Sequence, residues 1–439
     1  MNRTLWLART GARRRLVTVN RHLAHPAHPA HLAHLAVASV IAAVALGACG
    51  ATSGGRAALS AGADVSFQHV GGPPFGVVAT PDGRYAFVDL LQGRVLVYST
   101  RGSSAPRLIR SIPVPGEAVG SSLTRDGRLL LIANGQGATV VSVARAEHGA
   151  PHPVLGTLRP PAAAHLRAAG AIETASSADG RYVFVSLEDG QPGGAIAVYR
   201  LGSTAAARFG ASDYIGSITL GLAVVGSALS PDGKYLYVTS EVAGPPVARS
   251  LFKEGQTLAQ RVASGSQRPQ SPRSRQPDGS LSVIDVATAE RDPAHAVLAT
   301  APAMQEPVRV AVSPGGRVVW VTARASDRLL AFSAAKLVSD PAHALLASVR
   351  VGAAPVGVAV SAGGKRVIVA DSDRFNVRGA HAAVTVVEAH AALTHRSAIL
   401  ATLPAGQFPR EIAVEPGGVA LVTNFASDQV QTIDIPRVR

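Results

Sequence analysis

The hydrophobic and polar positions of this chain repeat in seven similar segments. Each segment has an apolar run, usually a Ser or Thr, an Asp-Gly or Gly-Gly pair, and then a second run rich in aromatic and β-branched residues. The pair begins at positions 82, 126, 179, 232, 315, 363 and 417. Asp-Gly and Gly-Gly supply the positive-φ residues of tight turns, so each segment predicts a β-hairpin.

Two further β-rich runs follow these hairpins. A third run follows each hairpin, for example at 94–99 and 429–434, and a more variable fourth run, as at 107–113 or 345–350, leads to the next segment. Four antiparallel strands per repeat form the blade of a β-propeller. The chain is therefore predicted to be all-β, with residues 64–439 forming a seven-bladed propeller.

The two ends of the repeat region are complementary. The last repeat stops after its third strand, while residues 64–70 form an alternating strand ahead of the first repeat. We expect this N-terminal strand to complete the last blade and close the ring, which removes exposed edges. One interval is longer than the others because residues 243–280 are rich in Ser, Gln, Arg and Pro. They predict a disordered or flexible insertion between the second and third strands of blade four.

The N-terminus has the features of an export signal. A basic segment containing Arg13–Arg15 precedes an apolar run at 35–48, which is shorter than the roughly 20 residues that a transmembrane helix needs. The run ends in Leu-Gly-Ala-Cys49, which resembles the lipobox of bacterial lipoproteins. We predict a signal peptide at 1–48, a flexible linker at 49–63 and Cys49 as the lipid anchor. The alternative is that Cys49 is a small buried apolar residue.

The predicted location is the outer face of the cytoplasmic membrane or another membrane of the cell envelope, with the bilayer as a partner through the acylated cysteine. The charge agrees with export better than with nucleic-acid binding. Residues 1–48 hold six Arg and no acid, so the formal charge of +14 falls to +8 without them. A further excess of +5 lies within 249–276, which holds six basic residues, one Glu and a single aromatic residue. Nucleic-acid sites interleave basic and stacking aromatic residues, so we expect no nucleic-acid partner.

Several repeat phrases resemble those of the YVTN-repeat β-propeller proteins. They are SPDGKYLYVTS at 230–240, PVRVAVSPGG at 307–316 and LVTNFASDQVQTID at 421–434. Related families with this repeat include lactonases, surface-layer proteins and redox-enzyme subunits. The resemblance implies the fold, and it adds one alternative activity, which is hydrolysis of a cyclic ester at the central channel.

A candidate site comes from aligning the innermost strands on their turns. The sixth residue before each turn pair, predicted to line the channel, is Gly76, Gly120, Glu173, Gly226, Arg309, Gly357 and Glu411. Four glycines are expected to keep the mouth open, and Arg410 adds a fourth charge to Glu173, Arg309 and Glu411. Converging carboxylates and guanidiniums can bind a polar ligand or perform acid–base chemistry. The alternative is a structural ion pair or solvated charges.

No other motif indicates a reaction. The sequence has no Gly-rich phosphate loop, nucleophile elbow or zinc motif, and its single Cys excludes a disulfide and a C-x-x-C-H haem site. Asp371, Asp373 and Asn376 lack an EF-hand spacing, so we expect neither a metal nor a cofactor. Ser-Asp pairs recur in register before three third strands, at 326–327, 372–373 and 427–428, and predict turn caps.

These observations favour a ligand- or protein-binding scaffold whose unknown partner is a protein, a glycan or a small molecule. Whether the chain is an enzyme is left open by its sequence, with a lactonase-type hydrolase as the alternative. Glu173, Arg309, Arg410 and Glu411 are the residues on which that alternative depends.

Overall fold

The computed structural model describes residues 64–100, 106–164, 166, 169–189, 193–202, 209, 213–243 and 277–438. The predicted signal peptide, Cys49, the linker and most of the 243–280 insertion lie outside these ranges. Within them, no helix is long and apolar enough to cross a membrane.

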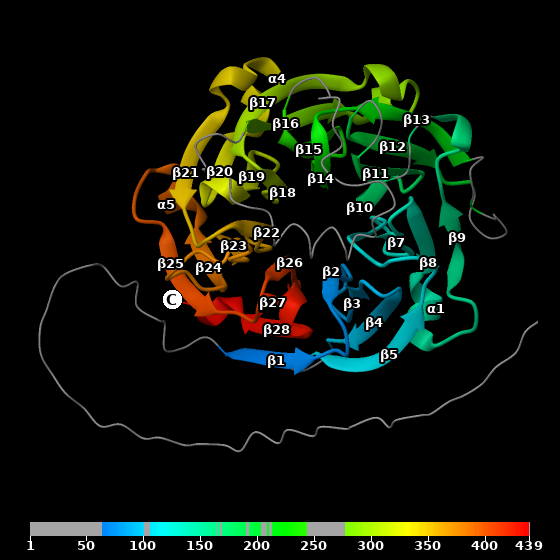
Figure 1. Ribbon diagram of the computed structural model, residues 1–439, viewed down its shortest axis with the longest axis horizontal. Helices are drawn as coiled ribbons and strands as arrows, with labels where there is room; N and C mark the ends of the chain where they lie inside the picture. The colour runs from blue at the N-terminus through cyan, green and yellow to red at the C-terminus, as the bar shows by residue number, and fades with distance from the viewer. Residues whose placement is uncertain are drawn as a thin grey trace, which may run out of the picture. The chain divides into compact units, whose positions relative to one another are not determined.

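Seven four-stranded antiparallel sheets form a ring (Figure 1). Their innermost strands lie next to one another around the centre. In blade order they are β2 (Pro74–Ala79), β6 (Ser121–Leu123), β10 (Ala169–Ser176), β14 (Leu222–Leu229), β18 (Pro307–Val312), β22 (Pro355–Val360) and β26 (Pro409–Val414). The seven predicted hairpins join each of these strands to the second strand of its blade.

The remaining strands follow outward in sequence order. The second strands are β3 (Tyr85–Leu90), β7 (Leu129–Ala133), β11 (Tyr182–Asp189), β15 (Tyr235–Val242), β19 (Val318–Ala323), β23 (Arg366–Asp371) and β27 (Val419–Asn424). The third strands are β4 (Arg94–Ser99), β8 (Ala138–Ser142), β12 (Ala195–Arg200), β16 (Asp278–Asp285), β20 (Arg328–Ser333), β24 (Ala383–Glu388) and β28 (Gln429–Asp434). The outermost strands are β5 (Arg107–Pro113), β9 (Val154–Leu158), β13 (Tyr214–Thr219), β17 (Val297–Gln305), β21 (Leu345–Arg350), β25 (Ile399–Pro404) and β1 (Val65–His69).

The ring closes as the sequence predicted. β1 pairs antiparallel with β28, with Val65 opposite Ile433 and His69 opposite Gln429. Figure 1 shows the blue strand β1 lying along the red strand β28. Every blade therefore has four strands, and the prediction of a propeller closed by the N-terminal strand is confirmed.

Within the described ranges, short helices follow four of the third strands, and these helices were not predicted. They are α1 (Val143–His148), α3 (Val286–Ala289), α4 (Ala334–Ser339) and α5 (Ala389–Leu393). Each begins where a side chain at the end of the third strand accepts a backbone N–H of the first turn, as Ser333 does from Lys336. With at most six residues, such helices have too short an apolar repeat to be recognised from periodicity.

Local hydrogen bonds explain the hairpin turns. In blade four, the Ser230 hydroxyl donates to Asp232 Oδ1 at 2.6 Å and accepts from the Tyr235 N–H at 3.0 Å. Asp232 Oδ1 also accepts the Lys234 N–H at 3.1 Å, and Gly233 has a φ of +76°. The Asp-Gly turns of the first three blades repeat this set of contacts. The turn sequence thus specifies the hairpin independently of its position in the ring.

Contacts between blades correct one prediction. A Cβ on Gly226 would lie 2.3 Å from the carbonyl oxygen of Val308 in the next blade, and Gly76, Gly120 and Gly357 are similarly close to backbone oxygens of the neighbouring innermost strand. Thr239 accepts the Gly226 N–H at 3.0 Å and donates to the Val308 carbonyl at 2.7 Å. The four glycines therefore allow adjacent innermost strands to approach closely, which is a different role from keeping a channel mouth open.

Candidate functional site

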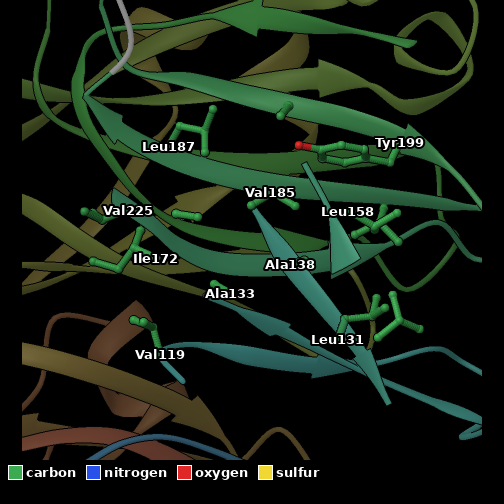
Figure 2. Packing of buried hydrophobic residues seen from close by; sticks show 14 of the residues in the cluster. Val119, Leu131, Ala133, Ala138, Leu158, Ile172, Val185, Leu187, Tyr199 and Val225 are labelled. Carbon is green, nitrogen blue, oxygen red and sulfur yellow. The ribbon is translucent and has the colours of Figure 1, made fainter. Parts of the chain in front are cut away.

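A ring of apolar residues lies one position before the predicted channel residues on the innermost strands. Six apolar side chains from blades one to six occupy equivalent positions on the innermost strands and belong to one buried cluster: Phe75, Val119, Ile172, Val225, Val308 and Val356. Figure 2 shows Val119, Ile172 and Val225 from three successive blades on the same side of this cluster. The seventh position is held by Arg410, on β26. A charge thus replaces an apolar side chain in an otherwise apolar ring.

Three of the predicted site residues meet in an ion-pair bridge. Arg309 Nε lies 2.6 Å from Glu411 Oε2, and Arg309 Nη2 lies 3.3 Å from Glu173 Oε2. The three residues come from blades five, seven and three, which are not neighbours, so their side chains meet across the centre of the ring. The exposed fractions of these side chains are only 5 % for Arg309, 11 % for Glu173 and 14 % for Glu411.

Burial controls the protonation of this bridge. Loss of solvation raises the pKa of Glu173 to about 8, a shift that Arg309 opposes and the charge of Glu411 reinforces. Burial also lowers the pKa of Arg309, but Glu411 and Glu173 outweigh it and raise the pKa above its ordinary value. The bridge therefore joins Arg309 to Glu411 beside Glu173, a carboxyl group whose protonated form is favoured by burial.

Asp89 places another buried carboxyl group nearby. It occupies the β3 position that corresponds to Thr239 of β15, and both of its carboxylate oxygens are buried. Burial raises the pKa of Asp89 to about 8, a shift that the side chain of Ser121 opposes and the charge of Glu411 reinforces. Asp89 is therefore also mainly protonated at neutral pH.

Arg410 is the charged group of this region that has no carboxylate partner. The residue is 5 % exposed, its Cζ lies 3.5 Å from the centroid of the Phe75 ring, and its Nε is enclosed without a hydrogen-bond partner. Among the described residues, no carboxylate forms an ion pair with it. Burial, followed by the charges of Arg309 and Arg374, lowers its pKa well below the ordinary value. Stacking on Phe75 compensates for only part of this cost.

A second ion-pair cluster lies at the ends of the second strands. Arg324 Nε and Nη2 each lie 2.8 Å from a carboxylate, of Glu306 and Glu241 respectively. This cluster was not predicted, although the repeat contains a signal for it. Glu241 and Arg324 stand two residues after the threonines of two successive repeats, and Glu188 stands at the same position in the preceding blade.

The remaining predicted residues have local roles. The hydroxyls of Ser326 and Ser427 accept backbone N–H groups of Gln305 and Gln407, each at 3.1 Å, which confirms the predicted turn caps at these two pairs. Asp371 is buried and accepts a hydrogen bond from Thr385 at 2.5 Å. Within the described ranges, no three His, Cys, Asp or Glu side chains are grouped as metal ligands.

Comparison with known proteins identifies the fold and leaves the family open. No protein-family model and no curated protein matches this chain. A solved structure of Kuenenia stuttgartiensis hydrazine synthase matches with a TM-score of 0.60 and 17 % identity, covering 85 % of this chain and 98 % of the other. The chain is a seven-bladed β-propeller.

The β-propeller domain of Cps50 (Swd1) from Myceliophteria thermophila also matches, with a TM-score of 0.57 and 12 % identity, covering 87 % of this chain and all of that domain. At such identities the likeness shows a shared fold alone. The propeller implied by the YVTN resemblance is confirmed, while membership of that family stays a prediction.

Proposed function

We propose that this chain is a lipid-anchored binding propeller of the cell envelope, held to the membrane by an acylated Cys49. The observation that supports binding over catalysis is the use of the central charges. Glu173 and Glu411 both contact the buried guanidinium of Arg309, so the two carboxyl groups expected to perform acid–base chemistry already have a structural partner. Among the described side chains, Arg410 at the centre contacts the Phe75 ring and no carboxylate.

One observation favours the alternative function, that of a hydrolase. The raised pKa of Glu173 would supply a protonated carboxyl group beside the carboxylate of Glu411. To act on a cyclic ester, the two groups would have to leave Arg309, because both are largely buried in contact with it. Breaking a buried ion pair is costly, commonly about 3–5 kcal/mol.

A turnover assay separates the two functions. The purified chain is incubated with a panel of lactones between about pH 5 and pH 9, where general acid–base catalysis would be detected. The binding proposal predicts no turnover. Lactone hydrolysis that is abolished by Glu411→Gln, in a variant whose circular dichroism and unfolding midpoint match wild type, would refute it.

The anchor is tested in the expressing cell. Cells are labelled with an alkyne fatty acid, and membrane and soluble fractions are compared for wild type and Cys49→Ser. We expect label and membrane association in the wild type only, because two or more acyl chains are needed for stable attachment. Membrane association of the variant, or a wild type without label, would contradict the proposed anchor.

A further inference from the structure

The side of the ring formed by blades six, seven and one combines free cations with an aromatic wall. Arg374 Cζ and Arg410 Cζ lie 5.9 and 5.6 Å from the centroid of the same ring, that of Phe408. Phe425 contacts Phe408 and Phe75 edge-on, with centroid distances of 5.6 and 5.9 Å. Two guanidinium groups therefore share one wall of three phenylalanines.

Exposure decreases from the surface inward along this wall. Arg374, Phe408 and Phe425 are half-buried, whereas Phe75 and Arg410 are buried, at 0 % and 5 % exposure. Arg374 and Phe425 follow the second strands of blades six and seven, and Phe408 precedes the innermost strand of blade seven. The group is thus a half-buried rim with a buried cation beneath it.

The nearby carboxylates do not neutralise these two cations. Glu411 is engaged with Arg309 at 2.6 Å, and Glu241 and Glu306 are engaged with Arg324. The charge of Glu188 acts on both Arg410 and Arg374, and the charges of Glu241 and Glu306 also act on Arg374. Within the described ranges, the direct contacts of the Arg374 and Arg410 guanidinium groups are with aromatic rings.

We propose that Arg410 and Arg374 form a binding site for a small organic carboxylate whose apolar body packs on the half-buried rings of Phe408 and Phe425. A guanidinium presents paired N–H donors that match a carboxylate, and a desolvated site strengthens such hydrogen bonds. Phosphate is disfavoured, because it has no apolar body to pack on the two half-buried phenyl rings. This inference deepens the proposed binding function and rests on it.

The repeat itself suggests why this arginine matters. The equivalent residue in the other blades is apolar, and four of the six are Val. Replacing a buried, unpaired charge with an apolar side chain of similar length should not destabilise a structural core. A buried arginine that costs stability, at a position where the other blades carry an apolar residue, is the pattern expected of a binding residue.

The test measures binding and stability in the same variants. The full chain, purified in detergent, is titrated calorimetrically with benzoate, hexanoate, inorganic phosphate and the uncharged analogue benzamide. We expect benzoate or hexanoate to bind, benzamide to bind at least about tenfold more weakly, and Arg410→Met to lose about tenfold or more in carboxylate affinity. Arg374→Gln should weaken binding less, because its side chain lies at the rim, and Arg84→Met on an exposed turn should bind as wild type.

Denaturant unfolding shows whether Arg410→Met loses the ligand without losing stability. Arg410→Met should unfold at a denaturant concentration equal to or above that of wild type while losing the ligand. Absence of carboxylate binding to wild type up to millimolar concentration, binding of phosphate alone, or undiminished carboxylate binding by Arg410→Met would each overturn the inference. These outcomes are separate from lactone turnover and from the Cys49 result, on which the proposed function depends.

Discussion

The buried carboxyl group of Asp89 makes the stability of this propeller depend on pH in an unusual direction. Its pKa is about 8 in the folded chain, against an ordinary value of 3.8 that we take for the unfolded chain. As pH rises above about 4, the unfolded chain loses this proton first, and the folded chain keeps it until about pH 8. The free energy of unfolding should therefore fall across this range and become constant above it.

The size of the effect follows from the two pKa values. Each unit of difference corresponds to about 1.4 kcal/mol, so between about pH 5 and pH 9 Asp89 should remove about 4 kcal/mol from the free energy of unfolding. Asp89→Asn eliminates this proton equilibrium and keeps the shape of the side chain. Its stability relative to wild type should increase by a similar amount over the same range.

Urea unfolding followed by tryptophan fluorescence measures this difference. Trp320 is 1 % exposed in the ring, and the other tryptophan, Trp6, lies in the predicted signal peptide. Asp126→Asn is the matched control. Slight burial of Asp126 is outweighed by a hydrogen bond from Thr124, so its pKa lies below the ordinary value and it stays ionised over the whole range.

The difference in the free energy of unfolding between wild type and Asp89→Asn isolates the contribution of Asp89. Other titrating groups contribute nearly equally to wild type and Asp89→Asn, so they largely cancel in the difference. If the two pH profiles run parallel to within about 1 kcal/mol, Asp89 is ionised in the folded chain and our account of its burial is wrong.

Two further predictions concern the turns and the ion-pair bridge. Gly315→Asp should raise the free energy of unfolding in urea by about 1–2 kcal/mol, because it adds the carboxylate that Asp-Gly turns use and a Cβ there meets no atom within 4 Å. Gly417→Asp should give no such gain, because Glu415 stands where the other turns have the Ser or Thr hydroxyl that donates to this carboxylate. Equal gains in the two variants would refute the mechanism. Arg309→Met should cost about 3–5 kcal/mol at neutral pH, because it leaves the buried carboxylate of Glu411 without its partner. Adding Glu411→Gln to this variant should recover much of the loss, and a loss unchanged in the double variant would contradict the role of charge.

The sequence by itself determined the blades and their number. A turn such as Ser230-Pro-Asp-Gly makes its hydrogen bonds within six residues, so it specifies a hairpin wherever it occurs. Seven hairpins with additional strands, and a spare strand at the N-terminus, leave ring closure as the arrangement that pairs every edge. The charged positions 173, 309, 410 and 411 were also correctly placed on innermost strands.

Only the tertiary structure decided how those charges are used. Arg309 contacts Glu411, 102 residues away, and the glycine at the same repeat position in blade four serves close packing between blades. Pairing, burial and pKa depend on side chains that approach from non-adjacent blades, and repeat spacing contains no information about their distances. For the same reason, the sequence did not show that Arg410 lies in an apolar ring without a carboxylate partner. This feature is the basis for the carboxylate ligand proposed at the centre of the propeller.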